Sequence, residues 1–167
     1  NERIEWQQDQ ISLYAKVHDV PRLQAWYGDE GLDYQYSGIQ LVAKPWFNEL
    51  LSLKKKVEDR LGEKFNAVLM NLYRSGDDYV AWHSDNEKEL GEDPHIASVS
   101  LGEERKFVFR HKETKEKVEV ILEHGSLLYM ADETQHKWEH MLPRTKKARG
   151  ERINLTFRQI QASGNSI

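Results

Sequence analysis

Beyond Gly62 the chain alternates between apolar and polar residues in short runs that are separated by turn residues. A period of two places successive side chains on opposite faces of an extended segment, so each run is typical of a β-strand. The expected strands cover residues 66–73, 96–101, 106–111, 117–122, 126–130, 137–142 and 151–159. Many short strands joined by polar turns predict a barrel or a two-sheet jelly roll. The predicted fold class is therefore mainly β with flanking helices.

A helix is predicted ahead of these strands, over residues 45–61, where apolar residues recur at helical spacing. Pro45 opens this segment and Gly62 follows it. Proline is favoured in the first turn of a helix and glycine just past the end, so both residues support the prediction. We interpret residues 1–12 as the end of another helix and the acidic stretch 84–94 as a loop.

The composition narrows the class of protein. A chain of 167 residues, of which 31% are charged, is expected to form a single domain over 1–167 with its own core. No apolar run reaches the length of a membrane span, and no signal-peptide pattern opens the sequence. The absence of cysteine excludes disulfides, thiolate metal sites and cysteine nucleophiles.

We expect an intracellular location, cytoplasmic, or nuclear in a eukaryote. Because the chain begins at Asn1, a truncated N-terminus is also expected.

Two histidines and one aspartate are the candidate metal ligands. His83 and Asp85 lie two residues apart, and His140 lies far downstream. Two imidazoles and a carboxylate on one face of the metal are the ligand set of non-haem Fe(II) oxygenases. The His-x-Asp spacing suits a strand end or a short turn, and the distant histidine would come from another strand. The pair His136 and His140 has the spacing of a zinc motif, but no glutamate follows His136, so we reject that interpretation.

The last predicted strand carries polar residues on one face. Alternation places Arg152, Asn154 and Arg158 together, opposite an apolar face. An exposed edge strand would give the same pattern, so that alternative stays open. Arginine holds carboxylates in a planar, bidentate geometry, and two arginines on one face suit a dicarboxylate such as 2-oxoglutarate. Asn71 and Tyr73 repeat the alternation shortly before the His-x-Asp pair.

In this order, these motifs resemble the AlkB family of Fe(II)/2-oxoglutarate dioxygenases. The resemblance extends from Val17 to Ile160 and is closest to the branch with the mammalian DNA-repair members. Further motifs that contribute to it are Pro21-Arg22, Tyr27-Gly28-Asp29, Ser37-Gly38, Pro45-Trp46 and the segments 96–100, 107–111 and 124–127. Each motif alone is weak, and it is their shared order that carries the resemblance.

The resemblance implies a double-stranded β-helix, a jelly-roll variant, in which His83, Asp85 and His140 ligate Fe(II). It also implies the reaction. O₂ oxidises 2-oxoglutarate to succinate and CO₂, the N-methyl group of a base is hydroxylated, and the product releases formaldehyde. The implied cosubstrate residues are Arg152 at the distal carboxylate, with Tyr73 and Asn154 assisting, and Arg158 and Asn71 near the metal-chelating end.

Substrate residues are also implied by the resemblance. A base must leave the stack before its methyl group can reach a buried metal. Tyr36 would stack on the flipped base, Tyr34 and Glu87 would touch its edge, and Arg22 would meet the nucleic-acid backbone. Tyr14 lies in a segment that aligns with a finger inserted into duplexes, where an aromatic wedge fills the vacated position. For the tyrosines, ordinary packing remains an alternative.

The expected partner is alkylated DNA, single- or double-stranded, read by a nucleotide-recognition region over residues 11–44 of a monomer. RNA is a further expected substrate. One alternative keeps the same chemistry but acts on RNA modifications, a protein or a small molecule. Another is a non-catalytic module that binds damaged nucleic acid. The net charge of −4 argues mildly against bulk attraction to nucleic acid, although basic runs occur at 54–56 and 144–149.

Overall fold

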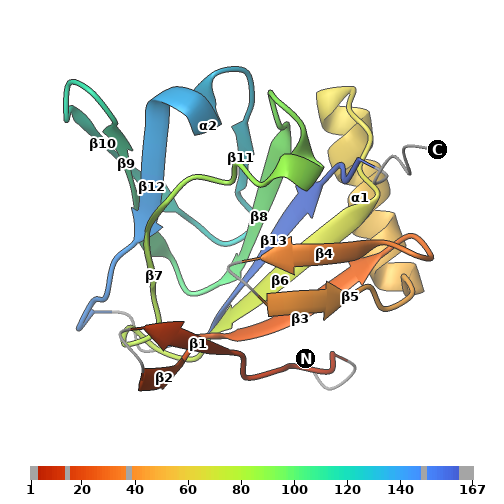
Figure 1. The fold of residues 1–167 in the computed structure, drawn as a ribbon, viewed down its shortest axis with the longest axis horizontal. Coiled ribbons are helices and arrows are strands. Elements are labelled where there is room, and N and C mark those ends of the chain that lie inside the picture. Colours follow the sequence, from red (N-terminus) through yellow and green to blue (C-terminus); the bar gives the residue numbers. More distant parts are fainter. Residues whose placement is uncertain (1–3, 14–15, 37–38, 148–149, 162–167) are drawn as a thin grey trace.

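The strands of the chain form two main antiparallel sheets and two separate hairpins (Figure 1). The computed structural model describes residues 4–13, 16–36, 39–147 and 150–161, with backbone only for residues 12, 13, 16, 33–36 and 39–41. The five-stranded sheet runs in the order β11 (Leu127–Met130), β8 (Ile96–Gly102), β13 (Arg152–Arg158), β6 (Ala67–Tyr73) and β3 (Leu23–Gly28). The four-stranded sheet runs in the order β10 (Lys117–Leu122), β9 (Arg105–His111), β12 (Trp138–Leu142) and β7 (Val80–His83). The hairpins are β1 (Gln10–Leu13) with β2 (Lys16–Asp19), and β4 (Asp33–Tyr36) with β5 (Ile39–Val42).

The seven strands predicted beyond Gly62 are all present, with bounds that differ from the prediction by at most one residue at either end. Strand β7 was not predicted as a strand, although its last residue is His83. The prediction of a mainly β fold with flanking helices is confirmed. Among the described residues, no helix is long and apolar enough to cross a membrane.

Strand β13 occupies the centre of the five-stranded sheet, between β8 and β6. The register pairs Asn154 with Asn71 on β6 and with Ser100 on β8. Both faces of β13 are covered, and even Arg152 is only 2% exposed. The alternative of an exposed edge strand is therefore wrong. The polar face of this strand is buried, and buried polar groups need partners.

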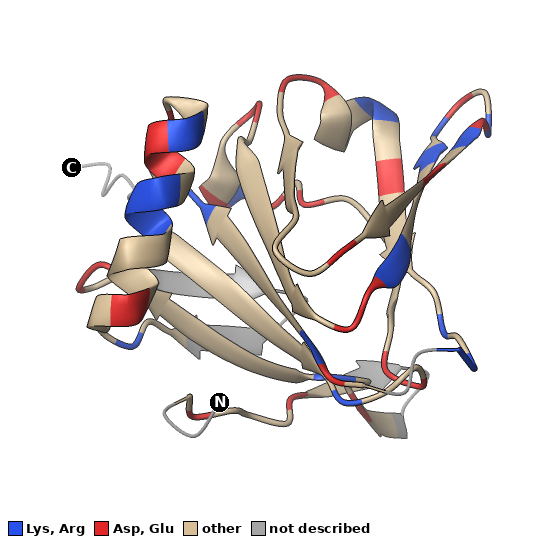
Figure 2. Ribbon diagram, turned by 180° about the vertical axis from the view of Figure 1, so that it is seen from behind, with Lys and Arg blue, Asp and Glu red and all other residues tan. Residues whose placement is uncertain are grey.

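Helix α1 (Asn48–Leu61) covers the opposite, apolar face of the same sheet. Its buried residues Leu50 and Val57 belong to the cluster that contains Leu155 and Phe157 of β13. The helix ends at Gly62, whose φ of 75° is left-handed and therefore favours glycine. Figure 2 shows lysine, arginine, aspartate and glutamate residues banded along α1, whereas the neighbouring strands are largely uncharged. The helix thus begins three residues later than predicted and ends where predicted.

The N-terminal part of the chain differs most from the prediction. No helix forms over the described residues 4–12. Instead, the backbone of Gln7 exchanges two hydrogen bonds with Gln24, 2.8 and 2.9 Å long, and β1 follows. This pairing with the sheet overrides the local helical preference. Strands β1 to β5 were not predicted, because four of the five contain only four residues. The acidic segment 84–94 is a loop except for the 3₁₀ turn Lys88–Leu90.

Candidate metal and cosubstrate site

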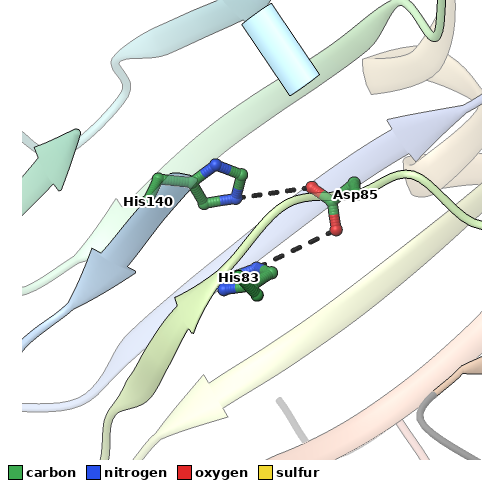
Figure 3. A group of neighbouring side chains, drawn as sticks. All are labelled: His83, Asp85 and His140. Carbon is green, nitrogen blue, oxygen red and sulfur yellow. Dashed lines mark ion pairs between the residues drawn. The ribbon is translucent and has the colours of Figure 1, made fainter. Parts of the chain in front are cut away.

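Three side chains, two from neighbouring strands and one from a loop, converge at one point between the sheets (Figure 3). His83 ends β7, and the register places it directly opposite His140 on β12. Asp85 follows two residues after His83, in the loop that leaves β7. One ligand atom from each side chain lies within 4.8 Å of the others. The structure therefore brings together the three predicted ligands in a spacing that a single metal ion can bridge.

The tautomer of His83 is fixed by a backbone carbonyl. Nδ1 of His83 lies 2.8 Å from the oxygen of Ala81, and because a carbonyl only accepts, Nδ1 carries the proton. The lone pair is then on Nε2, which faces Asp85 Oδ1 at 3.9 Å. Burial lowers the pKa of His83 to about 4, and the neighbouring His140 contributes to this shift. A neutral imidazole with Nε2 available is the form that binds a metal.

Asp85 is 2% exposed and ionised. Burial would raise the pKa of its carboxyl, but the Arg158 guanidinium and the two imidazoles hold that pKa well below its usual range. Arg158 Nη2 donates to Asp85 Oδ1 over 3.0 Å, and His140 Nε2 lies 3.5 Å from Oδ2. A buried carboxylate kept charged in this way is suited to cation binding.

His140 is 2% exposed and is held by aromatic rings. The ring of Phe107 lies 5.2 Å from the imidazole, tilted by 30°, and Phe109 lies edge-on at 5.8 Å. Among the described residues, Nδ1 of His140 has no hydrogen-bond partner. The two imidazoles are thus positioned differently, His83 by a hydrogen bond and His140 by packing.

Arg152 is a buried cation that lacks a carboxylate partner. Its Nη2 donates to Ser100 Oγ over 2.9 Å, and its guanidinium lies 5.2 Å from the ring centre of Tyr73. Within the described part of the chain, Nε has no partner and no ion pair involves this residue. Burial lowers the pKa of Arg152. Since a buried unpaired charge is costly, a bound carboxylate would be a suitable partner for this guanidinium.

The pocket beside the three ligand side chains is lined by most of the residues predicted for the site. It includes Arg22, Asn71, Tyr73, His83, Asp85, His140, Asn154 and Arg158. Arg152 does not line it, but lies next to Tyr73, which does. Asn154 donates to Ser98 Oγ over 2.7 Å and accepts from Thr156. Asn154 thus links Ser98 and Thr156 in a hydrogen-bond network along the pocket wall.

The residues predicted for the substrate are only partly described. Arg22 is buried, lines the pocket and donates to Asn71 Oδ1 over 2.9 Å, so its predicted contact with a nucleic-acid backbone stays a prediction. Glu87 is half-buried, directly before the 3₁₀ turn, and does not line the pocket. Tyr34 and Tyr36 lie on β4, where side chains are not described. Tyr14 lies outside the described residues.

Two kinds of site residue were not predicted. Ser98 and Ser100 accept hydrogen bonds from Asn154 and Arg152, and the alternation of β8 could have indicated them. Arg105 is 3% exposed and donates to the carbonyls of Ser75, Asp78 and Pro143, 5.8 Å from the ring centre of Tyr73. Arg105 lies directly before the predicted strand 106–111, so the alternation within that strand could not indicate a role for it.

Comparison with known proteins identifies the family of this chain. The model of the 2OG-Fe(II) oxygenase superfamily matches residues 1–158. The chain belongs to this superfamily. A superfamily of this kind uses Fe(II), 2-oxoglutarate and O₂, and the His-Asp-His triad is a set of side chains that could hold the metal. The predicted cofactors are thereby confirmed.

Within the oxygenase superfamily, the chain resembles two groups of AlkB relatives. It is 45% identical to the DNA oxidative demethylase ALKBH2 of Mus musculus over 90% of this chain and 66% of the relative. It is 40% identical to the alpha-ketoglutarate-dependent dioxygenase alkB homolog 3 of Homo sapiens over 94% of this chain and 58% of the relative. The resemblance to the AlkB family is confirmed. The chain spans less than two thirds of the length of either relative.

The fold of the oxygenase chain matches a solved structure titled "The structure of OsALKBH1". The TM-score is 0.61 at 18% sequence identity, over 92% of this chain and 81% of the other. At this identity the match shows the fold alone. Together with the two facing antiparallel sheets, it confirms the predicted double-stranded β-helix.

Proposed function

We propose that this chain is an Fe(II)/2-oxoglutarate-dependent dioxygenase that removes methyl groups from N-alkylated bases of DNA, such as 1-methyladenine and 3-methylcytosine. The names of the mammalian relatives support the reaction and the substrate. The observation that carries the proposal is a pocket that holds the His-Asp-His triad and Tyr73, next to which lies Arg152, a buried arginine with no carboxylate partner among the described residues. One catalytic domain over 1–167 is part of the proposal.

The proposed metal ligands are Nε2 of His83, Nε2 of His140 and the carboxylate of Asp85. When bound, Fe(II) and 2-oxoglutarate supply the oxidising chemistry with O₂. The chain holds the ligand atoms in place, keeps the imidazole of His83 neutral and keeps the carboxylate of Asp85 charged. Burial of Asp85 and His140 also keeps bulk water from the reacting centre.

The proposed cosubstrate site lies along β13 and β6. Arg152 would pair with the distal carboxylate, with Tyr73 and Asn154 assisting, because its guanidinium is buried beside Tyr73 and the described part of the chain gives it no acidic partner. Arg158 and Asn71 would lie near the end of the dicarboxylate that approaches the metal. Arg158 supports this placement through its 3.0 Å contact with Asp85.

For the base, we propose the roles that the resemblance implies, over a recognition region at residues 11–44. Tyr36 would stack on the flipped base opposite His83, whose side chain is 24% exposed beside the pocket. Tyr34 and Glu87 would contact the base edge, and Arg22 the backbone. Tyr14 would fill the vacated position in a duplex. A monomer is proposed, with action on single- and double-stranded DNA in the cytoplasm, or in the nucleus of a eukaryote.

Oligonucleotides that each carry one defined methyl lesion test the proposed function. With Fe(II), 2-oxoglutarate and O₂, we expect mass spectrometry to show loss of the methyl group from DNA, together with equimolar succinate. Matched RNA oligonucleotides test RNA as a second substrate. Loss of methyl from RNA alone would favour the RNA alternative. Binding of lesion DNA without succinate would identify a non-catalytic binding module.

A further inference from the structure

Gln135 is fully buried, yet neither the metal site nor the cosubstrate site described above includes it. It lies on the short helix α2 (Thr134–Lys137), directly before β12. Its Oε1 accepts the backbone N–H of Asp85 over 2.9 Å, and its Nε2 faces Met130 Sδ at 3.7 Å. Because a backbone N–H can only donate, the orientation of the amide is settled by this contact.

The contact lies where strand pairing ends. The β7–β12 ladder pairs His83 with His140, and β7 stops at His83. Beyond that point, the next two residues are held by side chains. Ser84 Oγ donates to the carbonyl of Trp138 over 2.8 Å, and the N–H of Asp85 donates to Gln135. These two bonds replace the missing ladder and link the loop that carries Asp85 to the segment that carries His140.

Gln135 is itself held in place. Lys112 Nζ donates to the backbone carbonyl of Gln135 over 2.7 Å. The backbone N–H of Lys112 donates to the backbone carbonyl of Lys137 over 2.8 Å. The turn that follows β9 (Arg105–His111) therefore anchors α2 through Lys112. An anchored acceptor can fix the backbone of Asp85, whereas a mobile one could not.

We propose that Gln135 is a positioning residue that holds the backbone of Asp85 so that its carboxylate stays at the metal position. The proposal rests on the proposed metal centre. Partners that orient a metal ligand through hydrogen bonds typically change metal affinity by about 10- to 100-fold when they are replaced. Gln135 would act in this way through the main chain of the ligand instead of its side chain.

Titration of the whole chain with Mn(II), in the absence of nucleic acid, tests the proposal. Gln135→Met keeps the length of the side chain but removes the amide oxygen, and we expect Mn(II) binding to weaken by about 10- to 100-fold. Gln135→Asn is one methylene shorter and should also weaken binding, so it serves where the Met variant does not fold. Gln135→Glu keeps an acceptor oxygen on a side chain of the same length. This variant should retain the Mn(II) affinity that Gln135→Met and Gln135→Asn lose.

The matched control is His136→Ala, the next residue of α2, which is exposed and paired with Asp93. It should leave Mn(II) affinity unchanged. Melting of the metal-free proteins separates the two possible roles of Gln135. A lower melting temperature with parental Mn(II) affinity in Gln135→Met or Gln135→Asn would overturn the proposal. A parent chain that binds no Mn(II) would contradict the metal centre itself, and with it the role of Gln135.

Discussion

The two faces of the five-stranded sheet are both buried, but they are buried by different residues and with different consequences. On the outer face, Leu155 and Phe157 of β13 pack with α1 in an apolar cluster. On the inner face, Arg152, Asn154 and Arg158 of the same strand are at most 8% exposed and polar. Burial of apolar area stabilises the fold, whereas burial of a cation such as Arg152 opposes it unless a partner is bound. The outer face thus accounts for the fold and the inner face for the proposed function.

The largest expected effect is at the proposed metal ligands, which come from the four-stranded sheet and the loop after β7 and line the same pocket as the inner face. His83→Ala removes one ligand and should abolish 2-oxoglutarate-dependent succinate formation. Because the His83 side chain is 24% exposed, the melting temperature of the His83→Ala variant should stay near that of the parent. Asp85→Ala should be equally inactive but less stable, since Arg158 loses a buried anionic contact. Full activity of either variant, with metal content measured, would disprove the ligand assignment.

The outer face should show the opposite pattern. Phe157 is fully buried and packs against Phe65, so Phe157→Ala should lower the free energy of unfolding by about 3–5 kcal/mol. Denaturant unfolding measures this loss, and Phe157→Leu, which leaves a smaller cavity, is the control. In the fraction that remains folded, Mn(II) affinity should be parental. If the Phe157→Ala variant folds stably but binds no metal, the outer face would affect metal binding as well as stability, and the separation of the two roles would fail.

A smaller effect is expected at the proposed cosubstrate site on the inner face. Arg152→Met should weaken 2-oxoglutarate binding by about one to two orders of magnitude, because a charge-assisted hydrogen bond contributes about 1.5–3 kcal/mol. Binding of DNA should change little. The KM for 2-oxoglutarate and the dissociation constant for an oligonucleotide are the two measurements. An unchanged KM would place the distal carboxylate elsewhere.

The sequence alone predicted both faces of β13 but not their burial. The alternation of Arg152, Asn154 and Arg158 was visible, as was the His83-x-Asp85 spacing. An edge strand and a central strand share this pattern, and only the pairing with β8 and β6 distinguishes them. The helix expected over 1–12 was wrong because Gln7 pairs with a strand distant in sequence. Gln135 was missed because its role depends on one contact across 50 residues.

The smallest expected effect concerns Tyr14, which lies outside the described residues. If it fills the position of a flipped base, Tyr14→Ala should lower the rate of repair in double-stranded DNA more than in single-stranded DNA. The ratio of the two rates on one lesion is the measurement. A ratio that does not move would exclude Tyr14 as the filler and leave the account of the two faces unchanged.

The central claim is that the buried polar face of β13 forms part of a binding site for a metal and a dicarboxylate. Calorimetric titration of the Mn(II)-loaded parent chain with 2-oxoglutarate, without nucleic acid, tests it most directly. We predict saturable binding of a single 2-oxoglutarate per chain, strongly weakened in Arg152→Met and in the metal-free protein. Absence of binding to the Mn(II)-loaded parent, or binding that ignores both the metal and Arg152, would contradict the claim.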